Sequence, residues 1–474
     1  MNEIHLKLNK NSDTPLYLQL YQQLKKDISA GILALGEKLP SKRHLAKSLL
    51  VSLSTIEAAY AQLQAEGYIE AQPRARFKVC FDHQQLFHND LPLKTDQASK
   101  TDKMYRFDFN PNAIDTQTFP LNLWKKQLRR LSNHQLQQLL CLGEKQGDRY
   151  LREQLKHYLY AARGVRCQIE QIIIIAGAET AMTQLCWLFD YLQEAQPFKY
   201  AMEQYGYAAV EKLLTIIHKE IIKLPIINDS QKINLELLEK HNINILYATP
   251  SHQYPYANVL SINERHRLLE WAAQQKNRYI IEDDYDSEFR YQGRPIPALQ
   301  SLDHAEKVIY LGSFSKLLMP SLRLSFMVLP PHLLKHYQQV CGQFNCTVPR
   351  INQHLVANLM QSGDFERHIQ RMRTHYRKRM ELLCQLLQPY RRNIHYYGTQ
   401  SGFYLLIELH NDNRTLNELT ALAEQAAIKL YPIHNQQQKR LFSLGFGNLN
   451  STELKQAIPL LMQTWHYSPD NIST

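Results

Sequence analysis

The sequence predicts a multidomain protein, in which a small N-terminal winged helix-turn-helix domain, mainly α with a small β-hairpin, precedes a large α/β domain with a mostly parallel sheet. Residues 10–80 carry amphipathic helices and then two β-prone segments. From residue 105 to about residue 465, short β-branched runs alternate with helical stretches. This alternation is typical of a parallel sheet covered by helices on both faces. The length of 474 residues is sufficient for roughly three domains of about 150 residues each.

The composition favours a folded protein with a polyanionic partner. Hydrophobic residues make up 44% of the chain and charged residues 21%, with a mean hydropathy of -0.43, which argues against a disordered chain. The formal net charge is +11 and the pI is near 9.1, and this excess of positive charge favours binding to a polyanion.

Cysteine usage and the N-terminus indicate the compartment. The seven cysteines are scattered, odd in number and without paired zinc-ligand spacing, so we expect reduced thiols and no metal site. The first residues contain no apolar signal-peptide segment, and no later run approaches the ~18 apolar residues that span a bilayer. We therefore expect a cytoplasmic protein without a membrane anchor.

The first two helices are predicted from their ends and their apolar faces. Thr14 can cap the first helix and Pro15 opens its first turn. The helix is expected to end at Gly31, and its inner face repeats Leu16, Leu20 and Leu24. After a turn over residues 36–40, Ser41 is the expected cap of a second helix that covers residues 42–50.

A third helix and a hairpin complete the N-terminal domain. Ser52 or Ser54 caps this helix, Gly67 is expected in a left-handed conformation after it, and its inner face contains Ile56, Ala59, Tyr60 and Leu63. Two β-prone segments, 68–71 and 77–80, flank a tip with Arg74 and Arg76. Helices followed by a hairpin predict a winged helix-turn-helix, and a small helical bundle is the alternative.

Several stretches of this domain match a known family. They include Thr-Pro-Leu-Tyr at 14–17, Gly-Glu-Lys-Leu-Pro-Ser-Lys-Arg at 36–43 and Glu-Gly-Tyr at 66–68. Residues 14–80 as a whole resemble the GntR-type winged-helix domain, which implies binding to double-stranded operator DNA. By this resemblance phosphates or base edges contact Ser41 and Arg43, the start of the recognition helix presents Ser52, Ser54 and Thr55, and the wing presents Arg74 and Arg76. The family usually has an arginine where this chain has Leu53.

The large domain should place its ligand site at one edge of the sheet. The β-branched runs occupy residues 171–175, 200–202, 243–247, 279–281 and 308–310. In sheets of this kind ligands gather at the carboxyl ends of the strands. Polar and charged residues follow several of these runs directly, so we expect the site there.

Lys316 is the most informative residue. It follows the last run through a loop with Ser313 and Ser315, and Arg323 comes shortly after. A lysine in this position can form a Schiff base with an aldehyde, while the serines and the arginine hold a phosphate. This layout suits pyridoxal phosphate (PLP).

Two further segments fit the same cofactor. Ala178 and Glu179 follow the first run and precede a helix, whose free N–H groups could hold phosphate. Asp283 and Tyr285 follow the run at 279–281, where a buried carboxylate keeps a pyridine nitrogen protonated and a tyrosine donates to the phenolic oxygen of the ring. Alone, this acidic cluster would equally suit a metal site or a solvated turn. The presence of Lys316 favours a PLP site over both alternatives.

Long stretches of the large domain match a second family. They are residues 108–111, 119–120, 146–147, 151–153, 162–167, 249–255 and 367–373. Residues 105–465 resemble fold-type I PLP-dependent aminotransferases, and their fusion to a GntR head through a linker at 81–104 resembles MocR/GabR-type transcriptional regulators. The resemblance implies an α/β aminotransferase-like fold, PLP as cofactor and a homodimer.

The resemblance also assigns roles to single residues. Lys316 would be the aldimine lysine, Asp283 the partner of the pyridinium nitrogen and Tyr285 the donor to O3′. The phosphate would be bound by Ser313, Ser315, Arg323 and the loop at Ala178 and Glu179. Tyr207 would lie against the cofactor ring, and a tyrosine of the hydrophobic core is the alternative.

Two departures from the family bear on function. Glu179 stands where the family usually has an uncharged glutamine, so its charge would oppose a phosphate and lower cofactor affinity. Arg440 is a candidate for binding the effector, although strict spacing places Ser443 at that position. We expect a regulator that senses an amine, an amino acid or PLP through an aldimine at Lys316, rather than an enzyme. A catalytically active aminotransferase with a DNA-binding appendage is the alternative, and a scaffold without cofactor is disfavoured.

Overall fold

The computed structural model describes residues 8–10, 12, 14–71, 76–82, 104–193, 196–226, 233–293, 296–434 and 439–470. The chain divides into two compact units, Met1–Lys103 and Met104–Thr474. This division falls at the end of the segment 81–104 that the sequence suggests as a linker, most of which lies outside the described residues.

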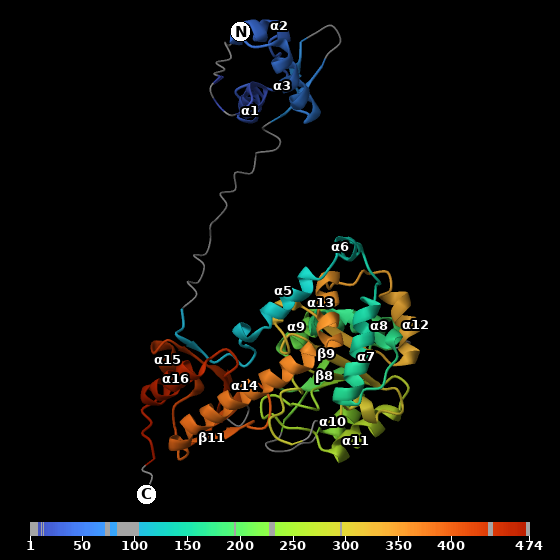
Figure 1. Cartoon of the computed structure of the whole chain (residues 1–474), viewed down its shortest axis with the longest axis vertical. Helices are drawn as coiled ribbons and strands as arrows, with labels where there is room; N and C mark the ends of the chain where they lie inside the picture. Colours follow the sequence, from blue (N-terminus) through green and yellow to red (C-terminus); the bar gives the residue numbers. More distant parts are fainter. Residues whose placement is uncertain are drawn as a thin grey trace. The chain divides into compact units, whose positions relative to one another are not determined.

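The N-terminal unit contains three helices and an antiparallel hairpin (Figure 1). Its elements are α1 (Leu16–Ser29), α2 (Lys42–Leu49), α3 (Leu53–Ala65), β1 (Ile69–Glu70) and β2 (Lys78–Val79). The helices share one core, formed in part by Leu20, Leu24, Ile28, Leu45, Ile56, Ala59, Tyr60 and Leu63. Because the hairpin pairs Ile69 with Val79, the predicted winged helix-turn-helix is confirmed over the simple helical bundle.

Serine caps begin the second and third helices, as the sequence predicts. The hydroxyl oxygen of Ser41 accepts the backbone N–H of His44 at 3.3 Å, and that of Ser52 accepts the backbone N–H of Thr55 at 3.2 Å. Each bond satisfies an N–H group that has no partner within its helix. Gly67 follows α3 with a φ of +78°, the left-handed conformation expected at this end.

The predicted cap of the first helix is wrong. The N-cap of α1 is Pro15, in extended conformation, and no side chain caps this helix. Thr14 lies one residue too early for its hydroxyl to cap the first turn. Its carbonyl instead accepts the side-chain amide of Gln19 at 2.6 Å.

The large unit is built on a seven-stranded sheet. In spatial order its strands are β4 (Ile172–Ile175), β10 (Ser325–Val328), β9 (Val308–Ser313), β8 (Tyr279–Asp284), β7 (Ile245–Ala248), β5 (Tyr200–Glu203) and β6 (Ile221–Leu224). Only β10 runs antiparallel to its neighbours, so the mostly parallel sheet is confirmed. All five β-branched runs named above form strands of this sheet.

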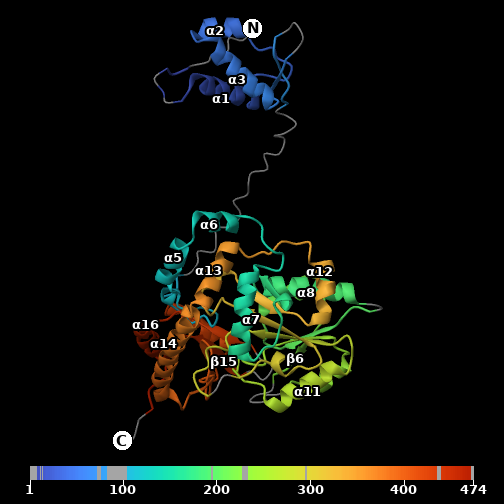
Figure 2. The same cartoon turned by 45° about the vertical axis from the view of Figure 1, so that its right-hand side comes forward.

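Helices cover both faces of the sheet, which explains why β4 is a run of four isoleucines. Ile172 and Ile174 pack against α7 (Arg149–Arg163) and α13 (Arg350–Gln361). Ile173 and Ile175 pack against α8 (Ala178–Leu192) and α12 (Pro331–Val340) on the other face. Figures 1 and 2 show the members of each pair of helices side by side. Alternate side chains of one strand therefore serve two layers of core.

The remaining helices are α5 (Leu121–Arg129), α6 (Asn133–Leu140), α9 (Ala208–Ile216), α10 (Leu235–Lys240), α11 (Ile262–Ala273), α14 (Asp364–Leu387), α15 (Leu416–Gln425) and α16 (Ser451–Thr464). Helix α11 contributes to a third cluster of buried side chains at the end of the sheet that contains β7 and β5. Among the described residues, no helix has the length and apolar character that crossing a membrane requires.

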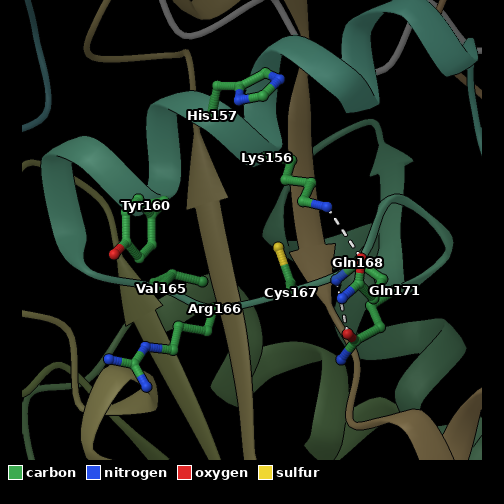
Figure 3. Close-up of a pocket in the computed structure, with 8 residues that line it drawn as sticks. All are labelled: Lys156, His157, Tyr160, Val165, Arg166, Cys167, Gln168 and Gln171. Atoms are coloured by element: carbon green, nitrogen blue, oxygen red, sulfur yellow. Dashed lines mark hydrogen bonds between the residues drawn. The ribbon is translucent and has the colours of Figure 1, made fainter.

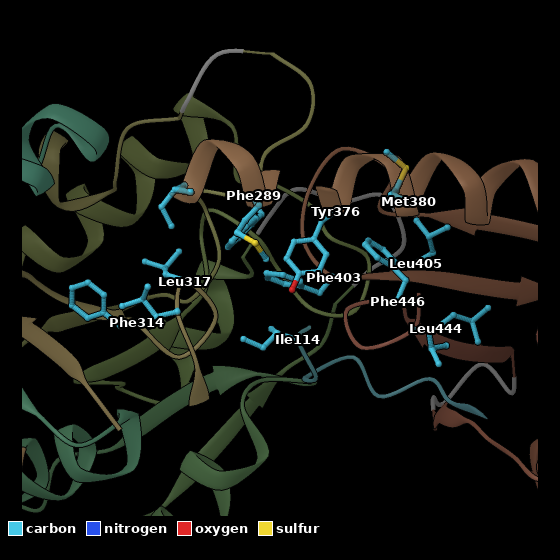
Figure 4. Packing of buried hydrophobic residues seen from close by; sticks show 14 of the residues in the cluster. Ile114, Phe289, Phe314, Leu317, Tyr376, Met380, Phe403, Leu405, Leu444 and Phe446 are labelled. Atoms are coloured by element: carbon cyan, nitrogen blue, oxygen red, sulfur yellow. The ribbon is translucent and has the colours of Figure 1, made fainter. Parts of the chain in front are cut away.

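A second, antiparallel sheet follows α14. Its strands in order are β11 (Ile394–Tyr397), β12 (Tyr404–Leu409), β15 (Arg440–Gly445) and β14 (Tyr431–Ile433), and a short parallel pair joins β3 (Phe107–Asp108) to β13 (Ile428–Lys429). Figure 4 shows Tyr376 and Met380 of α14 beside Leu405 of β12 and Phe403, which directly precedes that strand. The same cluster contains Phe314, so the core is continuous from the second sheet to the loop after β9.

Candidate functional site

Four strands of the large sheet end at the edge where the chemically active side chains lie. Strands β8 and β9 are parallel, with Asp283 opposite Leu311, so Asp283 and Ser313 both stand at carboxyl ends. Strand β4 ends at Ile175 and β5 at Glu203. The antiparallel β10 begins at this edge, because Ser325 is opposite both Ser313 and Ile175. Its first residues are therefore close to the loop after β4.

A candidate anion site lies where these segments meet. Gly177, with a φ of +107°, precedes α8, and no side chain caps that helix. Arg323 donates from Nη2 to the carbonyl oxygen of Ala176 at 3.1 Å. A Cβ atom on Gly177 would lie 2.3 Å from this nitrogen, so only glycine permits this close approach. The free N–H groups of α8 and a guanidinium are both suited to bind an anion.

Three serines lie beside this site. The backbone N–H of Ser315 donates to the hydroxyl oxygen of Ser313 at 3.1 Å, and the hydroxyl group of Ser325 donates to the same oxygen at 3.0 Å. These bonds fix the loop between β9 and Lys316. Ser325 was not identified from the sequence, because its position depends on the antiparallel entry of β10.

Glu179 lies in the first turn of α8 and is held from two sides. Arg323 donates to its Oε2 at 3.1 Å, and the hydroxyl group of Tyr207 donates to its Oε1 at 2.8 Å. Burial raises the pKa of Glu179, but its own backbone N–H, Tyr207 and Arg323 outweigh this effect and leave the pKa below its usual value. Burial and the bond to Glu179 raise the pKa of Tyr207 to about 12.

Lys316 points its amine toward the chain that precedes η1 (Thr116–Thr118). Nζ donates to the carbonyl oxygen of Asn112 at 2.6 Å and to that of Pro111 at 3.4 Å, and it lies 5.2 Å from the ring centroid of Phe403. Burial lowers the pKa of Lys316 to about 8, although the carboxylate of Asp286 acts in the opposite direction. Part of the population is therefore a neutral amine, which is the nucleophilic form.

Asp283 is a buried carboxyl group with one tyrosine partner. Burial raises the pKa of Asp283 to about 7, a hydrogen bond from the hydroxyl group of Tyr247 lowers it, and Asp284 adds to the rise. A cation beside Asp283 would favour its charged form. Tyr247 was not identified from the sequence, because its contact arises from the neighbouring strand β7.

Tyr285 belongs to a buried polar group with His252 and Asp286. Its hydroxyl group donates to the carbonyl oxygen of His252 at 2.8 Å, and Nδ1 of His252 lies 2.7 Å from Oδ1 of Asp286. Within the described residues, Nε2 of His252 is buried and has no hydrogen-bond partner. A Cβ atom on Gly402 would lie 2.2 Å from Cε1 of His252, so the loop before β12 closes tightly over this ring.

The structure thus brings most of the predicted residues to one edge. They are Lys316, Asp283, Tyr285, Tyr207, Ser313, Ser315, Arg323, Ala178 and Glu179. Arg440 makes its contact elsewhere, since its Nε donates to the carbonyl oxygen of Arg414 at 2.9 Å. Side chains alternate along β15, so Arg440 and the fully buried Ser443 lie on opposite faces of that strand.

A separate pocket lies between α7 and the chain before β4. Figure 3 shows its lining, which is Lys156, His157, Tyr160, Val165, Arg166, Cys167, Gln168 and Gln171. Nζ of Lys156 donates to Oε1 of Gln168 at 3.0 Å. Burial raises the pKa of Cys167 to about 11, which makes this thiol a weak nucleophile at neutral pH. The pocket contains none of the predicted site residues.

The N-terminal unit presents its predicted DNA-facing residues at the starts of two helices. Ser41 and Ser52 are exposed caps, and the hydroxyl oxygen of Ser52 also lies 2.9 Å from that of Ser54 and 2.7 Å from that of Thr55. Arg43 and Arg76 are exposed, and Arg74 lies outside the described residues. Leu53 is 41% exposed, so it stands on the surface and not in the core.

Comparisons with known proteins agree with both halves of this description. Residues 16–79 match the family described as "Bacterial regulatory proteins, gntR family", and residues 102–458 match "Aminotransferase class I and II". The large unit resembles the crystal structure of kynurenine aminotransferase from Pyrococcus horikoshii, with a TM-score of 0.66 and 22% identity over 77% of this chain and 91% of that chain. This likeness shows the fold.

Similar sequences are named as transcriptional regulators. The HTH-type transcriptional regulator YdeL of Bacillus subtilis is 34% identical, over 97% of this chain and 98% of its own. The probable rhizopine catabolism regulatory protein MocR of Rhizobium meliloti is 30% identical, over 80% and 79%. The pyridoxine biosynthesis transcriptional regulator PdxR of Corynebacterium glutamicum is 29% identical, over 81% and 82%.

A winged-helix unit fused to an aminotransferase-type unit defines a class of one-chain transcriptional regulators. The two family matches cover residues 16–79 and 102–458, and the relatives aligned over most of this chain are named as regulators. The chain belongs to the aminotransferase class I and II family and is an HTH-type transcriptional regulator of the MocR type.

Proposed function

We propose that this regulator binds PLP at Lys316 and couples the state of that site to operator binding by its N-terminal unit. The observation that carries the proposal is the convergence of Lys316, Asp283 and Arg323 at one sheet edge. PLP, when bound, supplies an aldehyde that reacts with amines and a ring that withdraws electrons. The name of PdxR, a regulator of pyridoxine biosynthesis, is consistent with this chemistry.

The residues present fit the three parts of PLP. The close approach at Gly177 brings the start of α8 and Arg323 together, and both are groups that suit a phosphate, although Arg323 contacts Glu179 here. Within the part of the chain that the structure describes, the hydroxyl group of Tyr247 donates to the buried Asp283, which can also accept a proton-bearing ring nitrogen. Lys316 offers an amine whose pKa of about 8 favours reaction near neutral pH. Glu179 does not fit the cofactor, because its negative charge would repel the phosphate.

Each residue then has a physical task. Arg323 and the start of α8 hold the phosphate, and Asp283 keeps the ring nitrogen protonated. Tyr285 would donate to the ring oxygen once its hydroxyl group leaves the carbonyl of His252. The amine of Lys316 would react with the aldehyde group of PLP. An amine or amino acid effector would compete with Lys316 for that aldehyde. The effector thus changes what Lys316 contacts.

The alternative is a working aminotransferase. The lowered pKa of Lys316 favours it, since a neutral lysine amine also serves as a general base in such enzymes. The names of the relatives favour regulation. We therefore propose that the aminotransferase-like unit acts as a sensor, and that any transamination is slow or partial.

The experiment that tests the proposal titrates operator DNA with three states of the protein: free of PLP, loaded with PLP, and loaded in the presence of a panel of amines. Linkage requires that DNA change ligand affinity by the same factor as the ligand changes DNA affinity. A typical coupling is about 1–3 kcal/mol, or roughly 5- to 150-fold. Equal DNA affinity in all three states, together with continuous keto-acid production, would reject the sensor in favour of the enzyme.

Operator recognition and the oligomer belong to the same proposal. We propose a homodimer that reads two half-sites, because winged helix-turn-helix proteins commonly bind paired sites and aminotransferase-type sites commonly form between two subunits. The residues that we assign to DNA are Ser41, Arg43, Ser52, Ser54, Thr55, Arg74 and Arg76. Of these, Ser41, Arg43, Ser52, Ser54 and Arg76 are exposed and Thr55 is partly exposed. Sedimentation equilibrium of the full chain, alone and with operator DNA, tests the stoichiometry. A monomer on a single half-site would contradict it.

A further inference from the structure

Glu179 occupies the part of the site that suits an anion. Its carboxylate accepts Nη2 of Arg323 at 3.1 Å and the hydroxyl group of Tyr207 at 2.8 Å, and it stands in the first turn of α8. These are the positive and hydrogen-bonding groups that a phosphate group would use here. An anion that belongs to the chain already contacts them.

The loop at Gly177 lies close to both charged groups. A Cβ atom added to Gly177 would lie 2.7 Å from Oε2 of Glu179 and 2.3 Å from Nη2 of Arg323. The side chains of Arg323 and Glu179 are 52% and 37% exposed, so an anion from solvent can reach the same donors. A second anion with a charge of about -2 cannot share the same donors without repulsion from Glu179.

We infer that Glu179 is an internal competitor for the phosphate of PLP, and that PLP binds only when this carboxylate gives up Arg323 and Tyr207. The inference rests on the proposed binding of PLP at Lys316. It explains why PLP would bind weakly, since its phosphate must first displace the carboxylate of Glu179. Acidic residues are common in the first turn of helices, where they interact favourably with the helix dipole. The contacts from Arg323 and Tyr207 are not explained by that general preference.

Displacement of the Glu179 carboxylate would also affect Tyr207, outside the phosphate site. Tyr207 is the N-cap residue of α9 and is 41% exposed, and its hydroxyl group is held by Glu179. When the carboxylate leaves, this ring is released to cover the cofactor. The empty and the loaded site then differ in the starts of both α8 and α9. A sensor of PLP concentration requires two such states with different contacts.

The test compares Glu179→Gln with the unchanged protein and with Glu236→Gln. Glutamine keeps the size of the side chain and removes its charge. Glu236 is an exposed acidic residue in the first turn of α10, so it reports the general effect of losing one such charge. Each full-length protein is titrated with PLP and, separately, with pyridoxal, which lacks the phosphate. Bound aldehyde is trapped on lysine with borohydride and located by peptide mass analysis.

We expect Glu179→Gln to raise the affinity for PLP about tenfold or more, and to leave the affinity for pyridoxal within about twofold. Glu236→Gln should leave both affinities unchanged. Equal PLP affinity in all three proteins, with the label on Lys316, would overturn the inference while the proposed function stands. A similar gain for PLP and pyridoxal would also overturn it, because the effect would not depend on the phosphate. No label on Lys316 in any protein would overturn the proposed function itself.

Discussion

The pH dependence of PLP capture by Lys316 follows directly from the environment of its amine. Only the neutral amine attacks an aldehyde, and burial lowers the pKa of Lys316 from 10.5 to about 8. At pH 7 a group with this pKa is neutral in about one molecule in ten, whereas a lysine at 10.5 is neutral in roughly one in 3,000. Capture at pH 7 should therefore be about 300-fold faster than by a solvated lysine of equal intrinsic reactivity.

The assay measures the initial rate of capture between pH 6 and pH 10, with borohydride trapping and peptide mass analysis at each pH. The rate should rise about tenfold per pH unit below the midpoint and level off above about pH 8. Lysine acetylated on its α-amine, which keeps a free ε-amine in water, serves as the solvated reference. The variant Asp286→Asn provides an internal check, because the Asp286 carboxylate raises the pKa of Lys316 and its removal should move the midpoint to lower pH.

Two results would refute this reasoning. A midpoint near that of free lysine would mean that the amine remains solvated, and a shift of the midpoint to higher pH in Asp286→Asn would mean that the carboxylate acts in the opposite sense. Because Asp286 also pairs with His252, the thermal unfolding of this variant must be compared with that of the unchanged protein.

Three further outcomes are expected. Arg43→Ala should weaken operator binding by about 1–3 kcal/mol in a salt-controlled binding assay, and an equal loss on random DNA would show that Arg43 contacts only phosphate. Ser52→Ala removes the cap of α3 and should lower the free energy of local unfolding there by about 0.5–2 kcal/mol, measured by hydrogen exchange; unchanged exchange would mean that the cap contributes nothing. Gly177→Ala should weaken PLP binding about tenfold or more, since a φ of +107° strains any other residue, and retained affinity would place the phosphate elsewhere.

The strands of the large unit were predictable where burial on both faces gives a continuous apolar run. Strands β4, β5, β7, β8 and β9 have this character, and their residues are buried nearly throughout. Strand β6 is at the sheet edge and only partly buried. Strand β10 is fully buried and as long as β4, but Val328 is the one β-branched residue among its four. Neither carries enough of the pattern to be identified without neighbours.

The sequence was sufficient to predict which residues gather at the site, but not which of them contact one another. Residues that follow strands could be assigned to one edge, because parallel strands place their carboxyl ends together. The pairing of Tyr247 with Asp283 and of His252 with Asp286 depends on register and loop closure, which the sequence does not state. The cap assigned to Thr14 failed for a local reason, since Pro15 already occupies the position that precedes the first turn.

The reversed direction of β10 has a consequence for how the protein is made. Arg323 and its acceptor Ala176 are 147 residues apart in the chain, and they meet only because β10 inserts between β4 and β9. A ribosome-bound chain that has not yet emerged beyond β10 lacks half of the anion site, however complete its other strands are. The proposed binding of PLP would therefore stabilise only a chain in which β10 has entered the sheet.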